Sequence, residues 1–390
     1  MEDMSFFSRV PLLRWLVPLL SAVVLLGGGW ALTQISAAAH TDLKPRSAAQ
    51  LLADVQRAHL DGLSGTIVQK SDLGLPSLPD AGGSGSSDLG SLVTGTHTLK
   101  VWFSGPDKAR VALLGTLGES DVVWNGTDLW TWSSKAHTAT HRTVQPPQHR
   151  SDQTLPDTVT TPQAAARAAL DAVKPTTKVV TSGTATVAGR PAYQLVLEPR
   201  DQNSLIGSVQ IGIDGATHVP TSFQILTDNG TTAFQVAFTH FDPTRPGAAQ
   251  FRFNPPPGTT VKEQKAPSSG APDLQAPPGM QDGMRGMPHG MLGMTGSAAP
   301  QVIGHGWTSV IVADLGSKAL SGLEQKAGPA SGQLTQMLGA LPPVTGRWGT
   351  GRAFEGTIFS AVLTNDGRIA IGAVPLQQVE AALNQAGSAR

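Results

Sequence analysis

The stretch Val122–His141, VVWNGTDLWTWSSKAHTATH, decides the fold of this chain. Apolar and polar residues alternate in it, which is the pattern of half-buried strands, and turn residues separate the runs. The pair Asn125-Gly126 tolerates the positive φ angles that a tight hairpin needs. Three of the eight tryptophans of the chain, Trp124, Trp130 and Trp132, lie within this stretch. It therefore predicts antiparallel hairpins that carry an aromatic wall.

Strands are expected within this stretch and on both sides of it, about ten residues apart and bounded by turn residues. They are residues 63–70, 96–104, 108–114, 119–124, 128–133, 137–144, 178–187, 191–198, 206–213, 220–227 and 232–241. A long antiparallel sheet twists and tends to curl or close. The predicted fold class is therefore α+β: a strongly curved antiparallel sheet of about eleven strands, forming an unclosed β-barrel that helices cover.

Two helices are expected to cover the concave side of this sheet. Residues 47–50 fit a capping box, in which Ser47 and Gln50 satisfy the first free backbone groups of a helix. Leu51 and Val55 then lie on one face of that helix. Thr161-Pro162 begins the second helix, with threonine as the cap and proline in the first turn.

The sequence divides into four parts. Residues 1–46 are an N-terminal anchor or signal segment, 47–263 the half-barrel, 264–300 a linker rich in Gly, Pro and Met, and 301–390 a small α+β domain. The expected elements of the small domain are a strand at 307–313, a helix at 331–341, a hairpin of 351–364 with 368–371, and a closing helix at 375–383. Residues 71–95 are rich in Gly and Ser and predict a long mobile loop with a short apolar segment at 89–93.

The N-terminal segment places the body of the protein outside the cytoplasm. Arg9 and Arg14 precede a run without charges from Trp15 to Ile35, close to the roughly 20 residues that span a bilayer. Positive charge before the run predicts a single-pass protein of the cell membrane with its N-terminus inside. Small residues before position 40 leave a second possibility open, in which a signal peptide is cleaved near Ala39 and the body is secreted.

Composition excludes several classes of function. The 28 Lys and Arg residues balance 28 Asp and Glu residues, and no basic stripe alternates with aromatic residues, so nucleic acid is not an expected partner. The chain has no cysteine, which excludes disulfides, thiol catalysis and thiolate metal sites. No zinc-protease motif, nucleophile elbow or phosphate loop is present, and carboxylates are scattered at turns. We therefore expect a protein that is not an enzyme and has no cofactor.

Several short motifs follow one another in a defined order along the chain. They are Gly105-Pro106-x-Lys108-x-Arg110, Trp124-Asn125-Gly126-x-x-x-Trp130-Thr131-Trp132, Val187–Tyr193, Ile213-Asp214 with Val219-Pro220, Phe238-Thr239-x-Phe241, Phe251-x-Phe253-x-Pro255-Pro256-x-Gly258 and Ile371–Val379. The ordered set resembles the LolA/LolB lipoprotein-carrier superfamily and, within it, the two-domain MucB/RseB branch of sigma-factor regulators. The loop at 71–95 and the Met-rich linker are not features of that family.

The resemblance implies an unclosed β-barrel that is lined by aromatic residues and holds the acyl chains of a lipid or an acylated lipoprotein. It also implies an alternative function, a regulator or sensor that binds the extracytoplasmic part of an anti-sigma factor. The expected partners are thus lipid or lipoprotein, the membrane through residues 15–35 and, in the alternative, an anti-sigma factor.

The candidate lipid-binding residues are Trp102, Phe103, Trp124, Trp130, Trp132, Leu51, Val55 and Arg110. The aromatic residues either form ordinary sheet core or line a hollow for acyl chains, whose binding rests on apolar area removed from water. Trp130 and Trp132 share one face of their strand, and whether this face borders the hollow is left open. Arg110 is either a solvated charge or, as the resemblance implies, a latch that bonds a helix carbonyl.

Metal binding is a weaker alternative. Five methionines lie close together in the linker: Met280, Met284, Met287, Met291 and Met294. Thioethers select Cu(I), so Cu(I) scavenging is one interpretation, although the glycines between them are typical of a low-complexity linker. His137 and His141 are roughly 13 Å apart on one strand at about 3.3 Å per residue, too far to share a metal ion.

Overall fold

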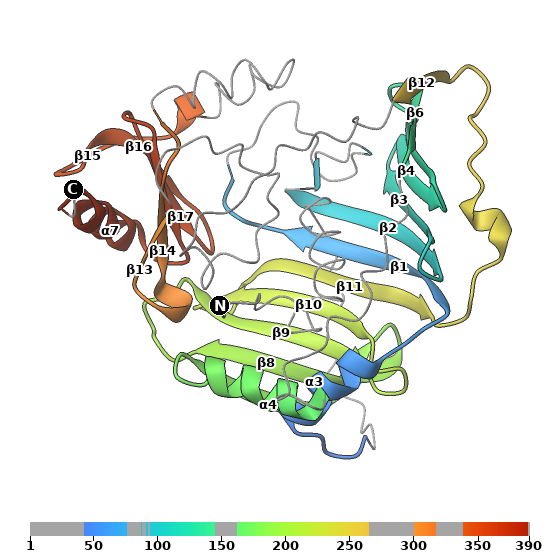
Figure 1. The fold of residues 1–390 in the computed structure, drawn as a ribbon, viewed down its shortest axis with the longest axis horizontal. Coiled ribbons are helices and arrows are strands. Elements are labelled where there is room, and N and C mark those ends of the chain that lie inside the picture. The colour runs from blue at the N-terminus through green and yellow to red at the C-terminus, as the bar shows by residue number, and fades with distance from the viewer. Residues whose placement is uncertain are drawn as a thin grey trace, which may run out of the picture.

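The computed structural model describes residues 43–75, 87, 91–92, 94–144, 162–264, 300–316 and 338–388. This part of the chain is mostly β-structure, with one large curved sheet that does not close and a small second sheet (Figure 1). The predicted membrane span at residues 15–35 and the Met-rich segment lie outside the described residues. Among the helices that are described, none has the length and apolar character needed to cross a membrane.

The large sheet has twelve strands in the described part of the chain, in the order β12-β6-β5-β4-β3-β2-β1-β11-β10-β9-β8-β7. They are β1 (Gly62–Ser71), β2 (Gly95–Ser104), β3 (Lys108–Gly115), β4 (Gly118–Asn125), β5 (Asp128–Ser133), β6 (Thr138–Thr143), β7 (Thr177–Val187), β8 (Arg190–Pro199), β9 (Ile206–Asp214), β10 (Pro220–Thr227), β11 (Thr232–Asp242) and β12 (Thr260–Gln264). Each strand expected between residues 63 and 241 overlaps one of them. The last, β12, was not expected, and it pairs with β6 in the parallel sense.

Local sequence accounts for the turns and the first helix. Gly126 has φ of 65°, as the Asn-Gly pair requires, and Asn125 pairs with Asp128 across the turn. The capping box is confirmed: the Gln50 backbone N–H donates to Ser47 Oγ, and the Ser47 N–H donates to Gln50 Oε1. This helix, α3, spans Ala48–Arg57, and the second, α4, spans Pro162–Val173.

Both helices pack against one end of the large sheet. The buried cluster around α3 and α4 contains Leu51, Val55, Tyr193, Leu195 and Ile213. Its sheet residues come from β7, β8 and β9. The helices therefore cover this end of the sheet and not the strands β2–β6.

The small sheet has the strand order β13-β14-β18-β17-β16-β15. The strands are β13 (Gln301–Ile303), β14 (Val310–Asp314), β15 (Pro343–Gly346), β16 (Gly349–Glu355), β17 (Ser360–Thr364) and β18 (Arg368–Gly372), and α7 (Leu376–Ser388) packs on them through buried Val379 and Leu383. The strand expected at 351–364 is wrong as one element, because the chain turns between Glu355 and Ser360. The strand expected at 307–313 is wrong in its first residues, since 306–308 form a 3₁₀ turn, η3. Most of the helix expected at 331–341 lies outside the described residues.

Hydrogen bonds join the small sheet to the large one. The Leu205 N–H donates to the Ala373 carbonyl at 2.9 Å, and the Thr357 N–H donates to the Leu73 carbonyl at 3.1 Å. Trp307 Nε1 donates to the Thr177 hydroxyl at 2.8 Å. These bonds place the small sheet at the ends of β1, β7 and β9, where it forms the left wall of the molecule in Figure 1.

Candidate functional site on the inner face of the sheet

Strand register shows which way each side chain points, because paired residues lie on the same face and successive residues on opposite faces. One row of paired residues crosses the sheet through Leu195, Ile211, Phe223, Val236, Gln69 and His97. It begins at Leu195, which packs with the helices. We call this helix-bearing side the inner face and the opposite side the outer face. In Figure 1 the segment that joins β11 to β12 runs along the outer side of β3–β6.

Phe103 and Trp124 lie on the inner face. Phe103 pairs with Ala109, and Ala109 pairs with Trp124 across the next ladder. The surrounding inner-face row is apolar and half-buried: Val101, Phe103, Val111, Val122, Trp124 and Leu129. Trp124 Nε1 donates to the Gly126 carbonyl at 2.7 Å, which fixes the ring over this row. The inner face of β2–β5 thus presents an apolar wall.

Trp102, Trp130 and Trp132 lie on the outer face. The segment after β11 covers them: Phe251 in the 3₁₀ turn η2 (Ala248–Phe251) is only 1% exposed. The Phe253 ring centroid lies 5.2 Å from that of Trp130 and 6.4 Å from that of Trp132. The candidate aromatic residues are therefore divided between the two faces, and these three are half-buried beneath the segment that follows β11.

Arg110 also points outward, away from α3 and α4. Its Nη2 donates to Asp121 Oδ2 at 2.6 Å and lies 3.8 Å from Glu119 Oε1, and its guanidinium stacks 5.2 Å from the centre of the Trp102 ring. Burial raises the pKa of Asp121 to about 6, with Arg110 opposing this and Glu119 adding to it. Arg110 balances two carboxylates on the outer face, and within the described residues no hydrogen bond joins it to a carbonyl of α3 or α4.

His141 has a role that sequence spacing did not predict. Its ring stacks on Trp130, with centroids 4.3 Å apart. Nε2 lies 2.9 Å from Asp128 Oδ1 and Nδ1 lies 2.9 Å from Glu263 Oε2. Hydrogen bonding to Asp128 raises the pKa of His141 above its ordinary value; burial opposes this, and Glu263 adds to it. The bond from His141 to Glu263 thus helps to hold β12 against β6. Separately, no group of three or more His, Cys, Asp or Glu residues in the described part of the chain could hold a metal ion.

Leu51 and Val55 are 0% and 2% exposed within the cluster that joins the helices to the sheet. They hold the helices in place, and neither borders the apolar wall of β2–β5.

Residues that the sequence did not identify as candidates lie next to that wall. Gln69, His97 and Leu92 are buried on the inner face beside Leu99. Alternation from Ile67 to Gln69 in β1 was the signal that could have identified Gln69.

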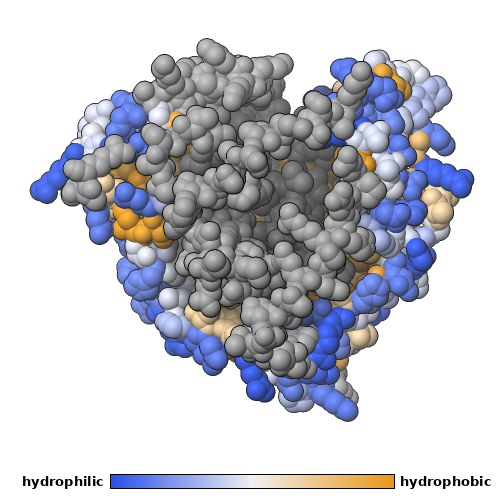
Figure 2. All heavy atoms as spheres, viewed as in Figure 1, coloured by the Kyte–Doolittle hydropathy of each residue, from blue (hydrophilic) through white to orange (hydrophobic). Residues whose placement is uncertain are grey.

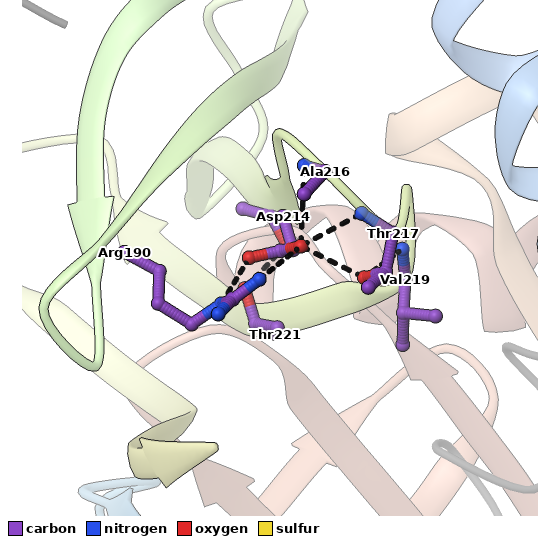
Figure 3. A network of polar contacts seen from close by, with 7 residues as sticks. Arg190, Asp214, Ala216, Thr217, Val219 and Thr221 are labelled. Carbon is purple, nitrogen blue, oxygen red and sulfur yellow. Dashed lines mark hydrogen bonds and ion pairs between the residues drawn. The ribbon is translucent and has the colours of Figure 1, made fainter. Parts of the chain in front are cut away.

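Two other polar sites are structural in character. Asp214 accepts hydrogen bonds from Arg190, Ala216 and Thr217, and so fixes the turn between β9 and β10 (Figure 3). Burial would raise the pKa of Asp214, but the bonds from Arg190 and Thr217 outweigh it and hold the pKa below its ordinary value. In the small domain, a cavity of about 480 Å³ is lined by Arg347, Trp348, Asp366, Arg368, Asn384, Gln385 and Gly387. Its Arg368 is paired with Asp366 at 2.9 Å, and its polar lining is unsuited to an acyl chain.

No protein-family model and no curated protein matches this sequence. Among solved structures, the chain is similar to the MucA/MucB complex of Pseudomonas aeruginosa, with 16% identity, 86% of this chain and 96% of that chain covered, and a TM-score of 0.39. It is also similar to a LolA-superfamily protein of Nitrosomonas europaea, with 12% identity, coverage of 54% and 99%, and a TM-score of 0.19. A third is a putative outer membrane lipoprotein-sorting protein domain of Vibrio parahaemolyticus, with 8% identity, coverage of 52% and 95%, and a TM-score of 0.21.

These solved structures belong to the same groups that the sequence motifs resemble.

Proposed function

We propose that the chain is an extracytoplasmic binder of lipid or lipoprotein acyl chains, without catalytic activity, which residues 15–35 tether to the membrane. The observation that carries the proposal is the row of half-buried apolar side chains on the inner face, with Phe103 and Trp124 at its centre. The half-barrel of residues 47–263 holds the site in this proposal, and residues 301–390 form a second domain beyond the linker 264–300.

The arrangement of the helices supports this proposal. They pack on β7–β9 and leave the inner face of β2–β5 to other contacts. An acyl chain laid on this wall removes apolar surface from water, at about 25 cal/mol per Å². In Figure 2 the visible rim of the molecule is mainly hydrophilic, with smaller hydrophobic patches.

Tryptophan quenching tests the proposal, because the two faces carry different tryptophans. The full chain, held in amphipol, is titrated with a phospholipid that carries a nitroxide on its acyl chain. All proteins in the test carry Trp15→Phe and Trp30→Phe, which removes the tryptophans of the proposed membrane segment. In this background Trp124→Phe should remove most of the quenching, since Trp124 lies on the inner face. Trp130→Phe, the matched control on the outer face, should leave the quenching in place. If quenching is lost in the Trp130 variant and kept in the Trp124 variant, the ligand lies on the outer face and the proposal is contradicted.

A further inference from the structure

Gln69 is a buried polar residue whose side-chain amide is not satisfied. It is 2% exposed, and its Nε2 has no hydrogen-bond partner among the residues that the structure describes. A buried amide without a partner lowers stability relative to one that is hydrogen-bonded, because its lost hydration is not replaced. Most such groups in folded proteins have a partner, so an exception needs a reason.

The position of Gln69 on the sheet indicates what this reason is. Gln69 pairs with His97 on one side and with Val236 on the other, which places it on the inner face. From His97 to Phe103, β2 runs six residues along this face, ~20 Å at about 3.3 Å per residue. The residues between them on the same face are Leu99 and Val101. Gln69 therefore stands at the polar end of an otherwise apolar wall.

Polar groups lie close to Gln69 at this end of the wall. His97 Nε2 lies 3.2 Å from the carbonyl oxygens of both Ser91 and Thr94, and the Ser120 hydroxyl donates to the Ser87 carbonyl at 2.6 Å. At the other end of the wall, Phe103 and Trp124 supply aromatic surface. Beyond them, the same row continues through Leu129 to Arg142, which is hydrogen-bonded to Gln264. Between the Gln69 end and this edge the wall offers apolar surface to a hydrocarbon chain, with the Gln69 amide as an unsatisfied donor at one end.

Leu92 now occupies the apolar surface next to Gln69. It is 0% exposed and packs on Leu99 and Leu113, with Ile67 and Val111 at the edge of the cluster. The Leu92 side chain supplies apolar contact to this surface but has no acceptor to offer the Gln69 amide. An occupant that carries both a hydrocarbon chain and an acceptor oxygen would satisfy both requirements.

We propose that Gln69 is the hydrogen-bond donor for the carbonyl oxygen of a bound acyl ester or amide, and that the ligand takes the place of Leu92. This inference rests on the proposed function and adds its ligand class: a chain with a carbonyl at its head, as opposed to a plain hydrocarbon or an ether. The chain extends from Gln69 along β2 and β3 toward Phe103 and Trp124.

A pair of matched lipids tests this assignment. Palmitoyl lysophosphatidylcholine has an ester carbonyl, and its hexadecyl ether analogue has the same headgroup and chain length without that carbonyl. The full chain should bind the ester about tenfold more tightly, the effect of one net hydrogen bond. Gln69→Met, close in shape but without the amide, should bind both lipids with the affinity of the wild type for the ether. Gln69→Leu provides a second variant, and binding of the ether reports that each variant is folded.

Gln224→Met is the control, because Gln224 is a buried glutamine in the same sheet that points to the outer face. This variant should keep the preference for the ester. Equal affinity of the wild type for ester and ether, or the same ratio in Gln69→Met, would overturn the assignment of Gln69 and leave the acyl site itself in place. If the wild type binds neither lipid, the proposed function is contradicted together with the inference.

Discussion

At the scale of single residues, neighbouring tryptophans of one hairpin have different environments. Trp124 lies on the inner wall, whereas Trp130, six residues later, is covered on the outer face by Phe253. Sequence alternation predicted that Trp130 and Trp132 share a face, and register confirms it. It could not predict which face borders the hollow, because both faces of β2–β5 carry apolar residues. The deciding contact comes from Phe253, more than a hundred residues away in the sequence.

Asp121 predicts a pH dependence of stability. Burial raises its pKa to about 6, so the folded state holds a proton more tightly than the unfolded state does. This contribution to stability is fully present below the ordinary pKa near 3.8 and is lost as the pH rises through about 6. Asp121→Asn cannot titrate and should reduce the loss of unfolding free energy between pH 4 and pH 7.5 by about 2 kcal/mol. Urea denaturation at the two pH values measures it, and a pH profile parallel to that of the wild type would contradict it.

His141 predicts that the attachment of β12 to β6 also weakens as the pH rises. Its pKa is raised by bonds to Asp128 and Glu263, so the hold on β12 is strongest below the ordinary pKa of 6.5 and weakens as the pH rises through the raised value. Hydrogen exchange of the β12 amides, corrected for intrinsic rates, should therefore speed up with pH. His141→Gln should remove this dependence. His137→Gln, at an exposed turn, should not change it, and equal effects of both variants would refute the assignment.

At the scale of elements, the locally coded parts were predictable. The capping box, the Asn-Gly turn and the alternation of the strands depend on residues a few positions apart. The strand β12 was missed because its pairing with β6 depends on contacts such as that of Glu263 with His141, 122 positions apart. The single strand expected at 351–364 ignored the break after Glu355, where residues 356–359 separate the end of β16 from the start of β17 at Ser360.

Leu51 tests whether α3 is structural or part of the binding surface. Because Leu51 is 0% exposed in the cluster between the helices and the sheet, Leu51→Ala should lower the unfolding free energy by about 3 kcal/mol. The affinity of the folded variant for acyl lipid should stay within about twofold of the wild type, since its side chain does not reach the wall of β2–β5. Leu117→Ala, at a turn where Leu117 is 99% exposed, should change neither quantity. A large loss of lipid affinity in the Leu51 variant would show that Leu51 contributes to the binding site.

At the scale of the whole molecule, the two sheets are joined by a few hydrogen bonds. Trp307→Phe removes the bond to Thr177 and keeps most of the ring. We expect a loss of about 1 kcal/mol in the coupling of the two domains, seen as faster hydrogen exchange in β14 with unchanged exchange in β4. Trp130→Phe, on the outer face of the large sheet, is the control and should leave exchange in β14 unchanged. Unchanged exchange in β14 after loss of the Trp307 bond would show that other contacts hold the domains together.

The strand β12 also has a mechanical consequence. All five of its residues are exposed, and side-chain bonds from His141 and Arg142 reinforce its pairing with β6. It is the last strand before the 35 residues that separate the described parts of the two domains, residues 265–299. Release of β12 would lengthen this tether by about 17 Å, at roughly 3.3 Å for each extended residue. Release of this edge strand would therefore let the two domains move further apart, and the protonation state of His141 sets how readily β12 is released.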